Sequence, residues 1–136
     1  MKLVINTDGA ARGNPGPAGI GAVIRREDGT VLAEISRFLG HATNNVAEYT
    51  ALILALEKAA ALGAAEVEVF TDSELMVKQI HGEYRVKNEG LKGLYQKVQE
   101  LAAGFSSFRI THVPREENKE ADRLANLGID EGLGKK

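Results

Sequence analysis

The chain has 136 residues, 43% of them apolar and 26% charged, which is typical of one globular domain and argues against a disordered chain. It contains no cysteine, which excludes a disulfide framework, a thiolate zinc site and a cysteine nucleophile. No run reaches 18 apolar residues, and polar residues interrupt positions 1–8 too early for a signal peptide. We therefore expect a cytoplasmic protein without a membrane span. The net charge of −2 does not indicate nucleic-acid binding, so any such function must come from a local site.

The first 40 residues are predicted to form three antiparallel strands. Apolar-rich runs at 2–7, 19–26 and 30–39 are typical of strands, and Glu27-Asp28-Gly29 has the composition of a hairpin turn. The stretch 10–17 is rich in glycine and proline, and we interpret it as a turn. This glycine-rich region lacks the Gly-Lys-Ser/Thr ending of a phosphate-binding P-loop, so it does not indicate a nucleotide site.

The rest of the chain alternates between helical and strand-like patterns. Helices are predicted at 44–62, 73–80, 89–103 and 118–129, and strands at 66–71 and 108–113. A run of strands followed by this alternation predicts an α/β fold, with a mixed sheet and helices on its faces. We assign 1–131 to one domain and expect 132–136 to form a disordered C-terminal tail.

Two aspartates follow predicted strands. Asp8 stands in Thr7-Asp8-Gly9, and Asp72 stands in Thr71-Asp72-Ser73. In open α/β sheets, sites form beyond the carboxyl ends of parallel strands, so these side chains are candidates for a site. The alternative for each is an ordinary turn or helix-cap residue.

Two further carboxylates lie within predicted helices. Glu48 shares its helix face with apolar residues and has no Lys or Arg three or four positions away, so its burial would be costly without a cationic partner. The alternative is a solvated helix edge. Asp122 borders an apolar stripe, and its alternative is a surface ion pair with Lys119. A converging group of four carboxylates would suit Mg²⁺, and two such ions can clamp the oxygens of a phosphoryl transfer.

Four segments of the chain closely resemble type 1 ribonuclease H, in that family's order and spacing. They are TDGAARGNPG at 7–16, TNNVAE at 43–48, TDS at 71–73 and HVPREENKEAD at 112–122, and the resemblance extends over residues 2–129. It implies the ribonuclease H-like fold, a five-stranded mixed sheet with helices on both faces. It also implies endonucleolytic cleavage of the RNA strand of RNA/DNA hybrids, leaving 5′-phosphate and 3′-hydroxyl ends.

The resemblance also implies roles for individual residues. Asp8, Glu48, Asp72 and Asp122 would be catalytic and would hold two Mg²⁺ ions, with Mn²⁺ as a substitute. One ion would activate water and the other would stabilise the leaving oxygen. His112 matches a histidine that assists proton transfer or product release. Its alternative, from the residues alone, is a strand-end histidine without a role.

Nucleic-acid contacts are implied in the same way. Three asparagines match residues that contact the RNA strand through its minor groove, where amides can pair with 2′-hydroxyls as donors and acceptors. Two further residues match a pocket for a phosphate of the DNA strand. The RNA set is Asn14, Asn44 and Asn45, and the DNA set is Thr43 and Asn88. From the residues alone, Asn14 could equally be a turn residue and Asn44 a helix cap.

The chain departs from the family pattern at three places. Glu74 replaces a common Gln, His41 replaces a common Arg of the DNA-phosphate pocket, and the short segment 82–87 leaves no room for the basic, Trp-bearing protrusion of some relatives. We therefore expect a monomer of modest affinity, with the RNA/DNA hybrid as partner and double-stranded RNA as a second candidate substrate. The alternatives from other classes are a catalytically silent hybrid-binding domain and, disfavoured by the asparagines, a DNA resolvase or integrase.

Overall fold

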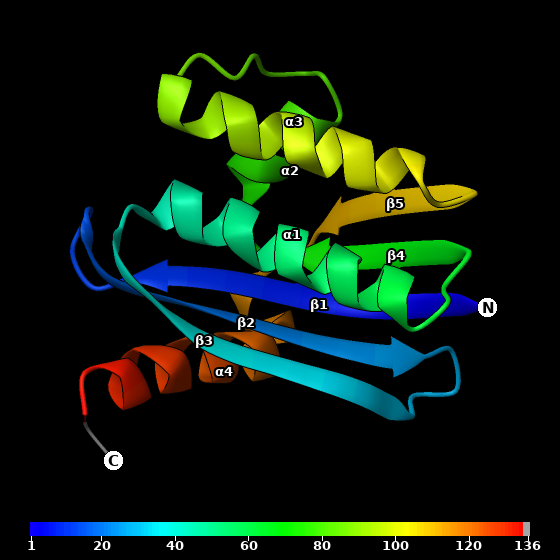
Figure 1. Ribbon diagram of the computed structural model, residues 1–136, viewed down its shortest axis with the longest axis horizontal. Coiled ribbons are helices and arrows are strands. Elements are labelled where there is room, and N and C mark those ends of the chain that lie inside the picture. Colours follow the sequence, from blue (N-terminus) through cyan, green and yellow to red (C-terminus); the bar gives the residue numbers. More distant parts are fainter. Residues whose placement is uncertain (135–136) are drawn as a thin grey trace.

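The computed structural model describes residues 1–134 and confirms the predicted α/β fold (Figure 1). Its elements follow the predicted order of three strands, a helix, a strand, two helices, a strand and a helix. They are β1 (Lys2–Ala11), β2 (Gly16–Arg26), β3 (Val31–Ala42), α1 (Asn44–Ala61), β4 (Glu66–Thr71), α2 (Glu74–Ile80), α3 (Glu89–Ala103), β5 (Ser107–His112), the 3₁₀ turn η1 (Arg115–Glu117) and α4 (Lys119–Gly132).

The five strands form one mixed sheet in the order β3-β2-β1-β4-β5. The first three strands are antiparallel, whereas β4 runs parallel to β1 and β5 runs parallel to β4. Thr7 of β1 pairs with Thr71 of β4, and Thr71 pairs with His112 of β5. The parallel pairing of β1, β4 and β5 therefore ends at one level, where Asp72 follows β4. Asp8, predicted to follow its strand, instead lies within β1, one residue past the last parallel pair.

Helices cover both faces of the sheet. In Figure 1, α1, α2 and α3 lie on one side of the sheet and α4 lies on the other. The main core lies between β1, β4 and α1, and it contains Leu3, Ile5, Val69, Leu52 and Leu56. In the part of the chain that the structure describes, no helix has the length and apolar character needed to cross a membrane.

The glycines of β2 let α4 approach the opposite face of the sheet closely. A Cβ atom on Gly21 would overlap with the backbone carbonyl of Ala121 and the backbone nitrogen of Ala125. Gly21 also pairs with Asp8 across β1 and β2. The helix that carries Asp122 is thus packed directly against the strand pair that carries Asp8.

Predicted boundaries were wrong at three places, of which the simplest is the end of β3, at Ala42 rather than 39. The stretch 10–17 is not wholly a turn, because β1 continues to Ala11 and β2 begins at Gly16, which leaves 12–15 as the connection. Small residues pair there across the strands, Ala10 with Gly19 and Ala11 with Ala18, without the alternating pattern that identifies a strand. At the other end, α4 runs to Gly132, beyond the predicted end at 129. Residues 135–136 of the predicted tail lie outside the described residues.

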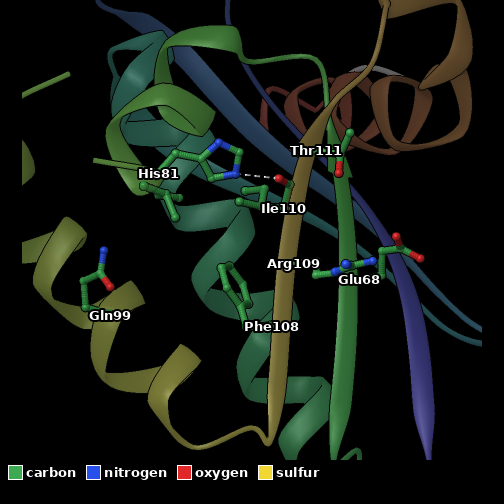
Figure 2. Close-up of a pocket in the computed structure, with 8 residues that line it drawn as sticks. Glu68, His81, Gln99, Phe108, Arg109, Ile110 and Thr111 are labelled. Carbon is green, nitrogen blue, oxygen red and sulfur yellow. Dashed lines mark hydrogen bonds between the residues drawn. The ribbon is translucent and has the colours of Figure 1, made fainter. Parts of the chain in front are cut away.

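Strand β5 forms one edge of the sheet, and a histidine side chain occupies part of that edge (Figure 2). The Nε2 atom of His81, at the end of α2, donates to the carbonyl of Ile110 at 2.9 Å. The two residues border a cavity of about 420 Å³, which none of the four predicted catalytic carboxylates lines. The contact satisfies one backbone acceptor of an edge strand and thereby limits pairing with other chains.

Candidate active site

Three of the predicted carboxylates converge where the parallel pairing of β1 and β4 ends. Asp8 and Asp72 follow the paired residues Thr7 and Thr71, and Glu48 reaches them from the second turn of α1. One carboxylate oxygen from each of the three lies within 4.8 Å of the other two. Asp8 is only 4% exposed, so it is not an ordinary solvated turn residue.

Close packing between α1 and β1 places Glu48 in this group. The backbone N–H of Gly9 donates to Oε1 of Glu48 at 2.9 Å. Gly9 has to be a glycine, because a Cβ atom there would overlap with the backbone of Ala47 and Glu48. The sequence indicated that Glu48 needs a cationic partner, and in the structure a backbone N–H dipole meets it instead.

We expect Gly9→Ala to lower the free energy of unfolding by about 1–3 kcal/mol, the usual cost of forcing extra volume into a packed interior. The added methyl group would push α1 away from β1 and weaken the hydrogen bond to Glu48. Urea unfolding measures the loss. Gly93→Ala in α3 is the control, because its Cβ would meet no atom within 4 Å and alanine favours a helix. Equal stability of Gly9→Ala and the unmodified protein would contradict this account of the packing.

Asp122 approaches the group from α4. Its carboxylate oxygen Oδ1 lies 3.5 Å from Nδ2 of Asn126 and 3.5 Å from Nη2 of Arg115. The nearby Asp122 carboxyl group also contributes to the raised pKa of Asp8, which places Asp122 beside it. Asp122 forms an ion pair with Arg115, whereas the sequence suggested Lys119 as the alternative partner. Asp122 thus adjoins the trio but is not one of its members.

Asn118 joins the start of α4 to β1 beside Asp8, a role that the sequence reasoning missed. Its side chain is almost completely buried, and its Nδ2 donates to the backbone carbonyl of Thr7 at 2.8 Å. Nδ2 of Asn6 donates in turn to Oδ1 of Asn118 at 3.0 Å. The position of Asn118 within the segment 112–122 was the available signal, but its partners lie more than 100 residues away in the chain.

Negative charge is strongly disfavoured at Asp8 and at Glu48. Burial is the largest cause and the charges of Glu48 and Asp72 follow, and together they raise the pKa of Asp8 to about 10. Burial and the charge of Asp72 raise the pKa of Glu48 to about 8, against the opposing effect of the Gly9 N–H. A divalent cation would relieve this repulsion, and a group of oxygen donors is the ligand set that hard cations prefer.

A groove beside the trio contains one of the predicted RNA contacts. It measures about 450 Å³ and is lined in part by Asp8, Asp72, Asp122 and Asn44. Oδ1 of Asn44 accepts from the N–H of Ala11 at 2.9 Å, and the N–H of Asn44 donates to Oδ1 of Asn14 at 3.1 Å. The structure therefore brings Asn14 and Asn44 together at the end of the first hairpin.

Two other predicted contacts act locally as helix caps. Thr43, not Asn44, caps α1, since its hydroxyl accepts from the N–H of Val46 at 3.2 Å. Asn88 caps α3 by accepting from the N–H of Gly90 at 2.7 Å. Their predicted contact with a DNA phosphate stays a prediction.

The remaining predicted positions are exposed. Asn45, at the start of α1, and His112, the last residue of β5, both face solvent. The pairing of His112 with Thr71 puts it at the sheet edge from which Asp72 emerges. Glu74 lies 3.9 Å from Lys78, one turn further along α2, so its charge is partly balanced.

Comparison with known proteins first assigns this fold and site to a broad class. Residues 6–128 match the family model described as Reverse transcriptase-like. A narrower assignment comes from a ribonuclease H of Methylococcus capsulatus, which is 37% identical, with 93% of this chain and 88% of that protein covered. The chain therefore belongs to the ribonuclease H family, as the sequence resemblance implied.

Other similar proteins include a much longer one. A bifunctional protein of Mycobacterium tuberculosis is 51% identical over 131 residues, and the chain spans 36% of its length. The solved N-terminal ribonuclease H domain of that protein matches with a TM-score of 0.93 and 50% identity, covering 96% of this chain and 100% of the domain. LC11-RNase H1, isolated from compost and solved with an RNA/DNA hybrid, matches with a TM-score of 0.92 and 48% identity, covering 96% of this chain and 99% of that one.

Proposed function

We propose that this chain is a metal-dependent endoribonuclease that cleaves the RNA strand of RNA/DNA hybrids and leaves 5′-phosphate and 3′-hydroxyl ends. The observation that carries the proposal is the convergence of Asp8, Glu48 and Asp72 within 4.8 Å, with Asp122 beside them, in a ribonuclease H-like fold. The similarity to LC11-RNase H1, solved with a hybrid, supports the choice of substrate.

The carboxylates are proposed to hold two Mg²⁺ ions, for which Mn²⁺ can substitute. Asp8, Glu48, Asp72 and Asp122 would supply the oxygen ligands. When bound, the ions activate a water molecule and stabilise charge on the leaving oxygen of the phosphodiester. The raised pKa values of Asp8 and Glu48 support this assignment, because a site that resists its own negative charge fits a cation.

The other polar residues would bind and orient the duplex. Asn14 and Asn44 are hydrogen-bonded at the groove, and Asn45 is exposed beside them, so these amides can pair with 2′-hydroxyls of the RNA strand. Thr43 and Asn88, at the first turns of α1 and α3, would contact a phosphate of the DNA strand. We also propose that the protein acts as a monomer, since one chain supplies all four carboxylates. Its proposed location is the cytoplasm.

Cleavage of matched duplexes tests the proposal. End-labelled RNA/DNA, RNA/RNA and DNA/DNA duplexes of one sequence are incubated with the protein in Mg²⁺, in Mn²⁺ and in EDTA. We expect cuts in the RNA strand of the hybrid with either metal, none in EDTA and none in DNA/DNA. The rate on RNA/RNA measures how strictly the hybrid is preferred. A folded protein that cuts no duplex with either metal would support the alternative of a silent hybrid-binding domain.

We expect His112→Ala to lower kcat by roughly 10- to 1,000-fold. The upper part of this interval overlaps the usual contribution of a positioned proton-transfer group. Activity should not disappear, because the four carboxylates remain. The measurement is kcat between pH 6 and 9. His81→Ala is the control, because it removes a histidine that contacts β5 away from the carboxylates. If His112→Ala had the same kcat as the unmodified protein at every pH, His112 would be a strand-end residue without a role in cleavage.

A further inference from the structure

Two groups of hydrogen bonds join β1 to α4, and Asp8 and Asp122 lie between them. The first is the hydrogen bond that the buried side chain of Asn118, just before α4, donates to the carbonyl of Thr7. The second lies beyond Asp8, at the end of the hairpin, where Nη1 of Arg12 donates to Oδ1 of Asp130 at 2.7 Å. The sequence reasoning gave Arg12 no role, although it lines the same groove as the carboxylates.

Arg12 also contacts Asn126, which lies one turn beyond Asp122 in α4. Nη2 of Arg12 is 3.3 Å from Oδ1 of Asn126 and 3.5 Å from its backbone carbonyl. The other end of the amide, Nδ2, donates to the backbone carbonyl of Asp122 at 3.0 Å and lies 3.5 Å from its Oδ1. Asn126 therefore stands between an arginine and a carboxylate.

The hydrogen-bonding chemistry of the Asn126 amide fixes its orientation between Arg12 and Asp122. A guanidinium only donates and an ionised carboxylate only accepts. The oxygen of Asn126 must therefore face Arg12 and the NH₂ group must face Asp122, because a flipped amide would lose both contacts. Arg12 is itself directed by Asp130, whose carboxylate it meets at 2.7 Å.

The position of Asp122 needs such support. Arg115 also lies 3.5 Å from its Oδ1, but the Arg115 side chain is 76% exposed, which makes that ion pair a weak constraint. The Arg12–Asp130 pair is also partly exposed, so we expect it to add little to stability. Its effect is geometric, since it ties the strand of Asp8 to the helix of Asp122.

We propose that Arg12 and Asn126 are positioning residues for Asp122: Arg12, anchored on Asp130, orients the amide of Asn126, which holds the Asp122 carboxylate toward Asp8. This inference rests on the proposed function of the carboxylates. It predicts that loss of Arg12 and loss of Asn126 impair the same step, because one acts through the other.

The test compares Arg12→Ala, Asn126→Ala and the double variant with Arg25→Ala. Arg25 is the matched control, because it also joins the sheet to α4, through Glu120 at 2.6 Å, without contacting Asp122. On an RNA/DNA hybrid we expect kcat to fall about 10-fold in Arg12→Ala and in Asn126→Ala, with KM little changed, since small misplacements of reacting groups cost up to about 100-fold. The double variant should be no slower than Asn126→Ala alone, and Arg25→Ala should match the unmodified protein.

A second measurement is independent of cleavage. The rise in Tm caused by Mg²⁺, without nucleic acid, should be smaller in Arg12→Ala and Asn126→Ala than in Arg25→Ala, because the misplaced Asp122 would bind the ion less well. If the unmodified protein cuts no duplex but these Tm shifts differ as expected, the proposed function fails and the positioning role stands.

Three results would overturn the positioning role. The first is Arg12→Ala with unchanged kcat and an unchanged Mg²⁺-induced Tm shift. The second is a raised KM with unchanged kcat, which would assign Arg12 to the substrate backbone. The third is additive losses in the double variant, which would show that Arg12 and Asn126 act independently.

Discussion

Asp72→Asn should reduce cleavage of the RNA strand by about 1,000-fold or more, the size of effect seen when a charge-stabilising group is lost in phosphoryl transfer. The amide keeps the shape of the side chain but removes one negative charge from three carboxylates that lie within 4.8 Å of one another. Glu48→Gln and Asp8→Asn should have effects of the same order. Single-turnover cleavage of an end-labelled hybrid measures the loss, and fluorescence anisotropy in EDTA should show that hybrid binding survives.

Asp28→Asn provides the matched control for this charge removal. Asp28 lies in the exposed turn between β2 and β3, where its Oδ1 accepts from the N–H of Thr30 at 2.9 Å. Its replacement should leave cleavage unchanged. If Asp72→Asn instead cleaved at nearly the rate of the unmodified protein, the site assigned to the ends of β1 and β4 would be wrong.

Asp8→Asn should stabilise the metal-free protein by about 0.5–2 kcal/mol at pH 8 while it nearly abolishes cleavage, because active sites commonly reduce stability. Burial, with the charges of Glu48 and Asp72, raises the pKa of Asp8 to about 10. Ionised Asp8 therefore opposes folding, and a neutral amide of the same shape removes that opposition. Urea unfolding in EDTA measures the difference.

The pH dependence of this effect has a definite sign. The folded-state pKa of Asp8, about 10, lies above its ordinary value of 3.8, so the folded protein binds the proton more tightly than the unfolded chain. Stability from this group is therefore greatest at low pH and falls as pH rises from about 4 toward 10. Glu48 adds a fall between about 4.5 and 8. The advantage of Asp8→Asn should be small at pH 5 and larger at pH 8.

Two comparisons complete this test. Hydrogen bonds from Thr30 lower the pKa of Asp28, so Asp28→Asn should not stabilise the protein at pH 8. Millimolar Mg²⁺ should stabilise the unmodified protein more than Asp8→Asn, which has lost a ligand. Unfolding of Asp8→Asn at a lower urea concentration than the unmodified protein, at pH 8 in EDTA, would show that hydrogen bonds, not repulsion, dominate at Asp8.

The elements and the carboxylates could be predicted because their signals are local. Gly63 marks the end of α1. Asp8 and Asp72 were identified because each directly follows an apolar, strand-like run in the sequence. Parallel strands bring their carboxyl ends together, so the convergence of these two side chains followed from the fold class alone.

The supporting contacts could not be predicted, because they join distant parts of the chain. Asn118 and Thr7 are 111 residues apart, and Arg12 and Asp130 are 118 apart. The periodicity of apolar residues indicates local helices and strands, and it carries no information on contacts between such distant residues. The need for glycine at position 9 is equally invisible locally, since the atoms that exclude a side chain there belong to Ala47 and Glu48.

The contact between the first strand and the last helix has a consequence during synthesis. The ribosome releases β1 long before α4, and Asp122 reaches Asp8 only after α4 has docked on the sheet, where Asn118 contacts Thr7 and Arg12 contacts Asp130. A nascent chain that has folded one residue past β4, as far as Asp72, already carries three of the four carboxylates. The complete set of four forms only once α4 is in place, so the onset of the proposed nuclease activity would report that α4 has docked.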